Sequence, residues 1–249
     1  MQVHVGTSGW AYSHWRGLFY PADLPARVWF SFYARYFHTV EINNTFYRLP
    51  AESTFEAWRI QAPAGFIYAL KASRYLTHIK RLKDPEAPLE LFLSRAQLLG
   101  PHLGPILYQL PPHWPLDLRR LEHFLAILPA GCQHVLEFRH PSWLCEPVFS
   151  LMERYGIAHC IHDMPPLEVP LRVTAPLVYV RFHGGPDYFG DYSDAELAEW
   201  AERIAGWCAA GHTVYVYFNN DALAYAVKNA LTLCRMLGLE VPAHPEDEI

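Results

Sequence analysis

Hydrophobic positions in this chain gather in eight short runs of β type, and each run ends in polar or charged side chains. These polar ends are residues 7–8, 41–44, 71–74, 109, 137–140, 162–163, 181–183 and 219–221. Stretches with apolar residues three and four apart separate the runs, a spacing that predicts helices. Polar residues at the carboxyl ends of eight alternating strands are typical of a TIM-type (β/α)8 barrel, whose active site lies at that end, here called the mouth. The pattern therefore predicts an α/β fold with parallel strands, as a single domain over residues 1–249.

The expected helices cover residues 26–37, 53–62, 88–100, 116–128, 146–156, 193–211 and 221–238. Ser-x-x-Glu pairs that begin at Ser53 and Ser193 have the spacing of a capping box, and Asp221 fits an N-cap. No helical spacing follows Asp163, where the chain reads MPPLEVPLRVTAP. We therefore expect the sixth helix of the barrel to be short or missing.

Alternation along the strands predicts which polar side chains point into the barrel. Residues two apart share a face, and one face of each strand looks inward. On the second run Val40 and Ile42 occupy one face and are apolar, so Glu41 belongs to the inward face. The same reasoning over all runs predicts an inward set at the mouth: Glu41, Asn43, Lys71, Glu137, Arg139, Asp163, Arg181 and His183.

Acidic side chains in this set are candidates for acid–base catalysis, because burial and neighbouring charges tune the pKa of a carboxyl group. Glu41, Glu137 and Asp163 are the predicted catalytic carboxylates. His183 is added because an imidazole exchanges protons near neutral pH. The alternative is a ring of salt bridges without chemistry, since the basic residues of the set nearly balance the acids.

Basic side chains in the same set predict a site for an anion. Arg139 and Arg181 can bind a carboxylate or a phosphate through two parallel hydrogen bonds, and Lys71 adds a point charge. Hydroxyl, amide and aromatic groups at neighbouring strand ends would complete the binding of a substrate. The predicted substrate-binding residues are Thr7, Ser8, Trp10, Asn43, Lys71, Arg139, Arg181 and Asn219.

Metal binding is a second interpretation of the mouth, because carboxylates and His183 are good ligands for divalent ions. The spacings HxH, HxD and HExxH are absent, and the two arginines of the set would oppose a cation. The motifs GxxxxGK, GxGxxG and GxSxG are absent as well. We expect neither a resident metal nor a cofactor.

Composition narrows the class of partner. The 20 basic and 25 acidic residues leave a net charge of −5, which argues against attraction of nucleic acid over the whole surface. The five cysteines form no CxxC pair, which fits reduced thiols and a cytoplasmic location. Neither a signal peptide nor an apolar stretch of membrane-spanning length is visible. The sequence leaves the oligomeric state open.

Six blocks of the sequence resemble a known family. The blocks are VGTSGWAYSHWRGLFYP, VEINNTFYRLP, KASRYLTHIKRL, LGPILYQLPP, EFRHPSW and YVYFNND. Their order and spacing resemble the YecE-like family, known as domain of unknown function 72, over nearly the whole chain. The resemblance implies a TIM-type barrel and no particular activity. It places within the family's motifs Thr7, Ser8, Trp10, Glu41, Asn43, Lys71, Glu137, Arg139, Arg181 and Asn219.

The leading hypothesis is an enzyme, a hydrolase or an isomerase, that acts on a small anionic, phosphorylated or nucleotide-like substrate. Glu41 or Glu137 would serve as acid or base, and the aromatic loop over residues 8–20 would cover part of the substrate. Two alternatives stay open. One is a metal-dependent nucleic-acid phosphodiesterase, by analogy with other barrels, and the other is a binding protein without catalysis.

Overall fold

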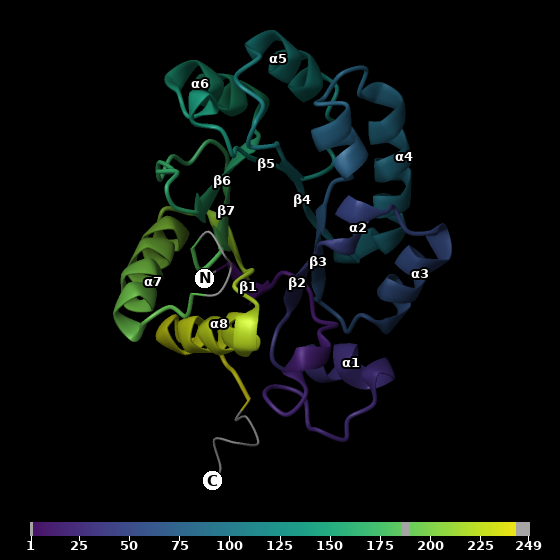
Figure 1. Ribbon diagram of the computed structural model, residues 1–249, viewed down its shortest axis with the longest axis vertical. Helices are drawn as coiled ribbons and strands as arrows, with labels where there is room; N and C mark the ends of the chain where they lie inside the picture. The colour runs from purple at the N-terminus through teal and green to yellow at the C-terminus, as the bar shows by residue number, and fades with distance from the viewer. Residues whose placement is uncertain (1, 186–189, 243–249) are drawn as a thin grey trace.

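Eight parallel strands form one sheet that curves into a ring, with helices on its outside (Figure 1). The computed structural model describes residues 2–185 and 190–242. The strands are β1 Val3–Thr7, β2 Thr39–Ile42, β3 Ile67–Lys71, β4 Leu103–Gln109, β5 His134–Glu137, β6 Ala158–Asp163, β7 Leu177–Phe182 and β8 Thr213–Phe218. Their spatial order is β1-β8-β7-β6-β5-β4-β3-β2. The predicted TIM-type barrel is confirmed.

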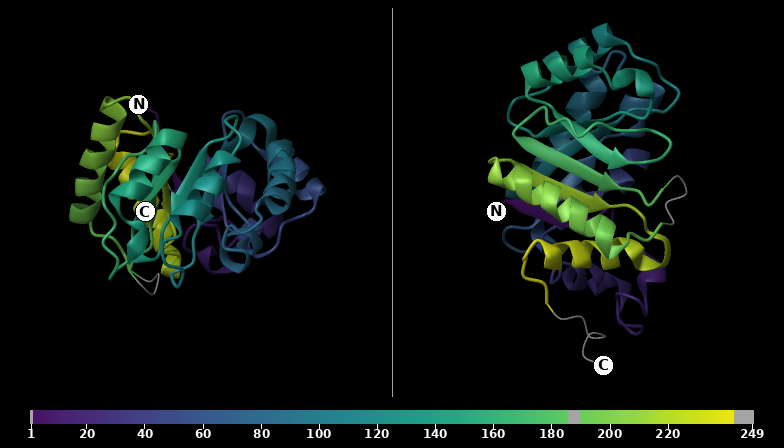
Figure 2. Two further views of the ribbon diagram at one scale, coloured as in Figure 1. Left: turned by 90° about the horizontal axis from the view of Figure 1, so that it is seen from above. Right: turned by 90° about the vertical axis from the view of Figure 1, so that its left-hand side faces the viewer.

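Helices lie at all seven of the predicted stretches, and α2 (Asn44–Tyr47), directly after β2, is one that the hydrophobic spacing did not predict. The others are α1 Trp29–Tyr33, α3 Glu52–Gln61, α4 Glu86–Ala96, α5 Leu118–Ala126, α6 Glu146–Tyr155, α7 Asp194–Ala209 and α8 Tyr225–Met236. Short 3-10 turns lie at Ser13–Trp15, Ala26–Val28, Gln97–His102, Pro141–Trp143 and Ala222–Ala224, and a π-helical turn at Tyr75–Ile79. Residues 164–176, between β6 and β7, contain no helix, so these strands lie between α6 and α7 without one of their own (Figure 2). The missing sixth helix is confirmed.

The capping box of α7 is confirmed, but the one expected at Ser53 is wrong. The Ser193 hydroxyl accepts a hydrogen bond from the Glu196 backbone, and the Glu196 carboxylate accepts one from the Ser193 backbone at 2.9 Å. Helix α3 begins earlier than expected, with Ala51 at its N-cap. Its first residue is then acidic Glu52, which the positive end of the helix dipole favours.

Asp221 does not cap the last helix, because a partner distant in sequence takes its carboxylate. Helix α8 begins only at Tyr225, after a 3-10 turn. The Trp15 indole N–H donates to Asp221 Oδ1 at 2.6 Å, and His14 Nε2 lies 3.2 Å from Oδ2. The long first loop is thereby attached to the end of β8.

The barrel has an apolar layer on each side of its strands. The outer layer packs the strands against the helices and holds most of the buried residues. The inner layer contains Ala69, Leu107, Val135, Ala158, Cys160, Leu177, Tyr179, Tyr215 and Tyr217. Buried tyrosine hydroxyls need partners, and Tyr179 donates to Glu41 while Tyr217 pairs with Thr39 at 2.6 Å. The interior is therefore apolar at its base and polar toward the mouth.

The junction of β1 with β2 is closed by side chains. In the described chain no ladder of backbone hydrogen bonds joins these two strands. The buried Tyr33 hydroxyl accepts from the Thr7 backbone N–H at 3.0 Å and donates to the Thr39 carbonyl at 3.0 Å. A Cβ on Gly6 would lie 2.3 Å from the Thr39 oxygen, so this close approach requires glycine. The junction keeps Ser8 and Glu41 adjacent at the mouth.

All five cysteines are free thiols, as expected. Within residues 2–185 and 190–242, none of the helices has the length and apolar content to span a bilayer.

Candidate functional site

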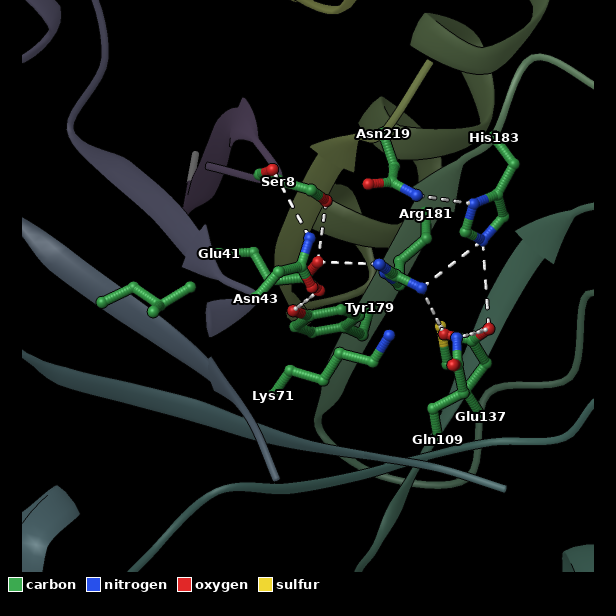
Figure 3. Close-up of polar contacts among 12 residues, drawn as sticks. Ser8, Glu41, Asn43, Lys71, Gln109, Glu137, Tyr179, Arg181, His183 and Asn219 are labelled. Atoms are coloured by element: carbon green, nitrogen blue, oxygen red, sulfur yellow. Dashed lines mark hydrogen bonds and ion pairs between the residues drawn. The ribbon is translucent and has the colours of Figure 1, made fainter. Parts of the chain in front are cut away.

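Arg181 is the centre of the polar interior. It lies on β7 in register with Tyr217 of β8 and His162 of β6, and it is only 1% exposed. Its guanidinium donates to Glu41 Oε1 at 2.8 Å and to Glu137 Oε2 at 2.6 Å. One arginine thus joins two carboxylates that lie 96 residues apart in the sequence (Figure 3).

Glu41, on β2, is held by three donors, one at the end of β1 and two on β7. Besides Arg181, the Ser8 hydroxyl donates to Oε1 at 2.7 Å and the Tyr179 hydroxyl donates to Oε2 at 2.7 Å. The side chain is fully buried. A buried carboxylate is stable only when such donors replace its water. Glu41 therefore accepts hydrogen bonds on both oxygens from within the protein.

Glu137, at the end of β5, is held in the same way. Gln109 donates to Oε1 at 2.8 Å, Arg139 Nε donates to the same oxygen, and Arg181 donates to Oε2. Burial opposes its ionisation, but the charges of Arg139 and Arg181 prevail and hold its pKa well below the usual value. Glu137 is therefore an ionised carboxylate at neutral pH and a weak base.

Lys71, at the end of β3, differs from the other charged groups at the mouth. It is 8% exposed, and its ammonium makes neither a hydrogen bond nor an ion pair with any described residue. Its nearest defined partner is the Phe46 ring, whose centroid lies 4.3 Å from Nζ. Burial, followed by the charge of Arg181, lowers the pKa of Lys71 to about 8. Figure 3 shows the side chain extended toward Arg181 and Glu137.

His183 completes one side of the mouth. Arg139 Nη2 lies 3.0 Å from His183 Nε2, and the Asn219 amide lies 3.2 Å from Nδ1. Because a guanidinium can only donate, Nε2 accepts the hydrogen bond from Arg139. Burial and the neighbouring arginines lower the pKa of His183 well below its usual value. The ring is therefore neutral at pH 7.

Three side chains at the mouth have possible metal-ligand atoms close enough together to bind one ion. One ligand atom each of Glu137, His162 and His183 lies within 4.8 Å of the others, and His162 Nδ1 is a buried atom without a partner. However, Arg139 contacts both Glu137 and His183, and Arg181 binds Glu137. A cation among the three donors would face two guanidiniums, so the electrostatics of the mouth favour an anion.

The structure brings together most of the residues that the sequence singled out. Ser8, Glu41, Asn43, Lys71, Glu137, Arg139, Arg181, His183 and Asn219 lie together at the mouth, and Figure 3 labels all of them except Arg139. Asn43 donates to the Ser8 carbonyl at 3.4 Å, and its own amide oxygen is buried without a partner.

Three predicted residues lie elsewhere. Asp163 was expected on the inward face, but it shares the outer face of β6 with Ile161, because Cys160 is the residue that points inward. Its carboxylate accepts from the His183 backbone N–H and from the Tyr192 hydroxyl. Thr7 bonds to Tyr33 and the Gly9 carbonyl at the β1–β2 junction. Trp10 packs on Phe30, Trp58 and Tyr68 below the first loop.

Sequence reasoning missed Tyr179, Gln109 and His162 as members of the site. Tyr179 lies two residues before Arg181 on β7, so the alternation rule would have placed it inward. The same rule, applied from Cys160, selects His162 instead of Asp163. No sequence signal distinguishes Gln109 from an amide at any other strand end.

Comparison with known proteins gives the family. A family model described as "Protein of unknown function DUF72" matches residues 4–248. The chain belongs to the DUF72 family. The resemblance drawn from the six sequence blocks is thereby confirmed.

Relatives of this DUF72 chain cover almost its full length. The UPF0759 protein YunF of Bacillus subtilis is 26% identical over 276 residues, covering 96% of this chain and 95% of the relative. The UPF0759 protein YecE of Escherichia coli K12 is 26% identical over 267 residues, covering 96% and 94%. These relatives support family membership and indicate no specific activity.

Solved structures of the family share the barrel. A DUF72 family protein from Thermotoga maritima is 29% identical, with a TM-score of 0.87 over 96% of this chain and 100% of that one. A DUF72 family protein from Enterococcus faecalis is 21% identical, with a TM-score of 0.80 over 96% and 97%. The second likeness concerns the fold alone.

Proposed function

We propose that this DUF72 protein is an enzyme that binds a small anionic substrate at the mouth of its barrel and performs acid–base chemistry on it. One observation carries the proposal: within the described chain, the Lys71 ammonium is a buried cation without a carboxylate partner. The inner charged set consists of Glu41, Lys71, Glu137, Arg139 and Arg181. Three cations and two anions leave it one positive charge, which an anionic ligand would neutralise.

A second observation supports the same sign of charge. His78 lies in the π-helical turn that follows β3. Burial, then the charges of Lys71 and Arg74, lower the pKa of His78 to about 4. The cations Lys71 and Arg74 on either side of this histidine, with Arg74 exposed, give this side of the mouth a positive potential.

Lys71 is also the group best suited to move a proton. A catalytic acid or base works best when its pKa lies near the working pH. Glu137 stays ionised and His183 stays neutral at pH 7, whereas the pKa of Lys71 is about 8. In this proposal Lys71 exchanges the proton, while Glu41 and Glu137 hold the arginines in place.

Thermal shift tests the binding step. Phosphate, sugar phosphates and small mono- and dicarboxylates should raise the melting temperature of the native protein at pH 7. Lys71→Met should weaken the affinity for the best of them by about tenfold, equivalent to about 1.4 kcal/mol. Lys83→Met, at an exposed lysine outside the mouth, is the matched control and should leave the shift unchanged. Equal shifts in the native protein and Lys71→Met would contradict the assignment.

Deuterium exchange tests the chemistry. Proton NMR in D2O would follow loss of the C–H signals next to the acidic group of each stabilising anion. Exchange of these hydrogens for deuterium that occurs with the native protein and is lost in Lys71→Met supports an enzyme. The saturated hydrogen bonding of Glu41 and Glu137 favours a second candidate, a receptor that binds the anion without changing it. Binding without exchange of any bonded hydrogen, and without conversion of the anion, would favour that receptor.

A further inference from the structure

Lys71 combines three features that the anion site by itself does not require. Its nitrogen makes no hydrogen bond within the described chain. The nitrogen is not fully buried, so it keeps access to the mouth. The flat face of the Phe46 ring lies against it at 4.3 Å. The third feature is the guanidinium of Arg181, toward which the side chain of Lys71 extends (Figure 3); Arg139 binds the same Glu137 that Arg181 binds.

We propose that Lys71 is a covalent nucleophile that forms an imine with the carbonyl carbon of a small anionic aldehyde or oxo acid. The proposal rests on the proposed anion site and names the substrate class of that site. Lysine becomes nucleophilic when it is desolvated or lies next to another cation, because both conditions favour the neutral amine. The structure supplies both conditions at Lys71 and at none of the three other lysines of the chain: Lys80, Lys83 and Lys228.

Groups on four elements set the ionisation of Lys71. After burial, which has the largest effect, its pKa is lowered by Arg181 on β7 and Arg139 beyond β5, and raised by Glu137 on β5 and Glu41 on β2. The cation–π contact with Phe46 favours the ammonium and partly opposes the burial. The net result is a lowered pKa of about 8.

The reaction is balanced with the groups at hand. The ammonium first loses a proton to water, and the nitrogen lone pair then attacks the carbonyl carbon. A C–N bond forms and the C=O π electrons move to oxygen; the nitrogen loses a proton and the oxygen gains one, giving a neutral carbinolamine. The hydroxyl then takes a proton and leaves as water with the C–O electron pair, while the nitrogen lone pair forms the C=N bond of a protonated imine, which returns a proton to water to give the neutral imine. No oxidant or reductant is consumed, and the imine withdraws electrons from the neighbouring C–H or C–C bond.

An anionic substrate fits the charges that remain after the lysine has reacted. A neutral imine at Lys71 leaves Glu41, Glu137, Arg139 and Arg181 as a balanced set, and a protonated imine restores one positive charge. The carboxylate or phosphate of the substrate would then face the protonated imine and exposed Arg74. A neutral aldehyde gains nothing from these charges, so it serves as the comparison compound.

Reductive trapping tests the proposal on the full-length native protein. The protein is incubated at pH 7 with glyoxylate or pyruvate and sodium cyanoborohydride, and peptides are mapped by mass spectrometry. Propanal is the neutral comparison. An adduct adds the mass of the oxo acid less one oxygen atom. Lys71 should be labelled about tenfold more than the average of the three other lysines, because a larger fraction of it is amine. Lys71→Met should lose this adduct, and Lys83→Met should keep it.

Each outcome separates the imine from the anion site. Selective labelling of Lys71 by the oxo acids supports the imine. Anion-dependent thermal stabilisation without selective labelling overturns the imine and leaves the proposed function standing. The absence of both stabilisation and labelling overturns the imine and the anion site together. Labelling of Lys71 by propanal as strongly as by pyruvate overturns the anionic substrate class.

Discussion

Replacement of Arg181 by methionine is the sharpest test of how the interior is held together. Arg181 is 1% exposed and binds Glu41 and Glu137, which are both fully buried. Breaking a buried ion pair by removing one partner costs about 3–5 kcal/mol, because the remaining charge stays buried. In a barrel of this size each 1 kcal/mol lowers the melting temperature by roughly 2–4 °C. Arg181→Met should therefore lower it by roughly 6–20 °C.

The loss should depend on pH in a defined direction. The lowered pKa of Glu137 means that its ionised form stabilises the native protein above the unfolded carboxyl pKa, about 4.3, and that this stabilisation disappears as the pH falls through the folded value. Arg181→Met removes one source of the lowered pKa. The difference in unfolding free energy between native and variant should be largest at pH 7 and should shrink below about pH 4.

Urea unfolding followed by circular dichroism at pH 7 and at about pH 3 measures both effects. Arg203→Met is the matched control, since Arg203 pairs with Glu199 at 3.2 Å on the exposed side of α7 and should cost less than about 1 kcal/mol. The double variant Arg181→Met with Glu41→Gln should lose less than the two single losses combined, because it removes the carboxylate that Arg181→Met leaves without a cation, while Glu137 keeps Arg139. A loss for Arg181→Met no greater than that for Arg203→Met would refute the reasoning.

Three further predictions concern the mouth and the β1–β2 junction. Lys71→Met should raise the unfolding free energy at pH 7 by on the order of 3 kcal/mol, because the lowered pKa means that the ammonium destabilises the native protein. This gain should vanish as the pH rises from about 8 to about 10.5, and urea unfolding that shows no gain at pH 7 would contradict it. Tyr33→Phe should cost about 1–3 kcal/mol and speed amide exchange at the junction, since its hydroxyl serves two buried backbone groups. Exposed Tyr75→Phe is its control, and equal effects of the two would count against the bridge. Gly6→Ala should destabilise the barrel by about 1–3 kcal/mol or more, because its Cβ would overlap backbone 2.3 Å away. Gly131→Ala has nothing within 4 Å and should be neutral, so similar melting temperatures for both glycine variants would be inconsistent with a tight junction.

The eight strands and most of the mouth residues could be predicted because they depend on local periodicity. Alternation placed Glu41, Lys71, Glu137 and Arg181 at one end of one barrel, where the structure has them. The same rule failed at Asp163, because it was applied to the last polar residue of the run instead of being counted from Cys160.

Caps show where local signals lose to distant partners. Ser193 and Glu196 are three residues apart and satisfy one another, so sequence spacing was sufficient for the capping box. Asp221 is an equally favourable N-cap residue by its sequence position, but its carboxylate accepts a hydrogen bond from Trp15, 206 residues away in the sequence. Where a side chain has two possible partners, tertiary packing decides which one it binds. A short window of sequence does not reveal that packing.

The sequence by itself determined the family, the (β/α)8 fold, the missing sixth helix and the end of the barrel where the charges gather, because periodicity and motif order are properties of the chain. Only the tertiary structure decided which charges pair. It placed Arg181 between Glu41 and Glu137 and left Lys71 without an acid. A sequence counts charges, but ion pairing depends on distances of about 3 Å between different strands, and a lysine's pKa depends on the water that folding removes.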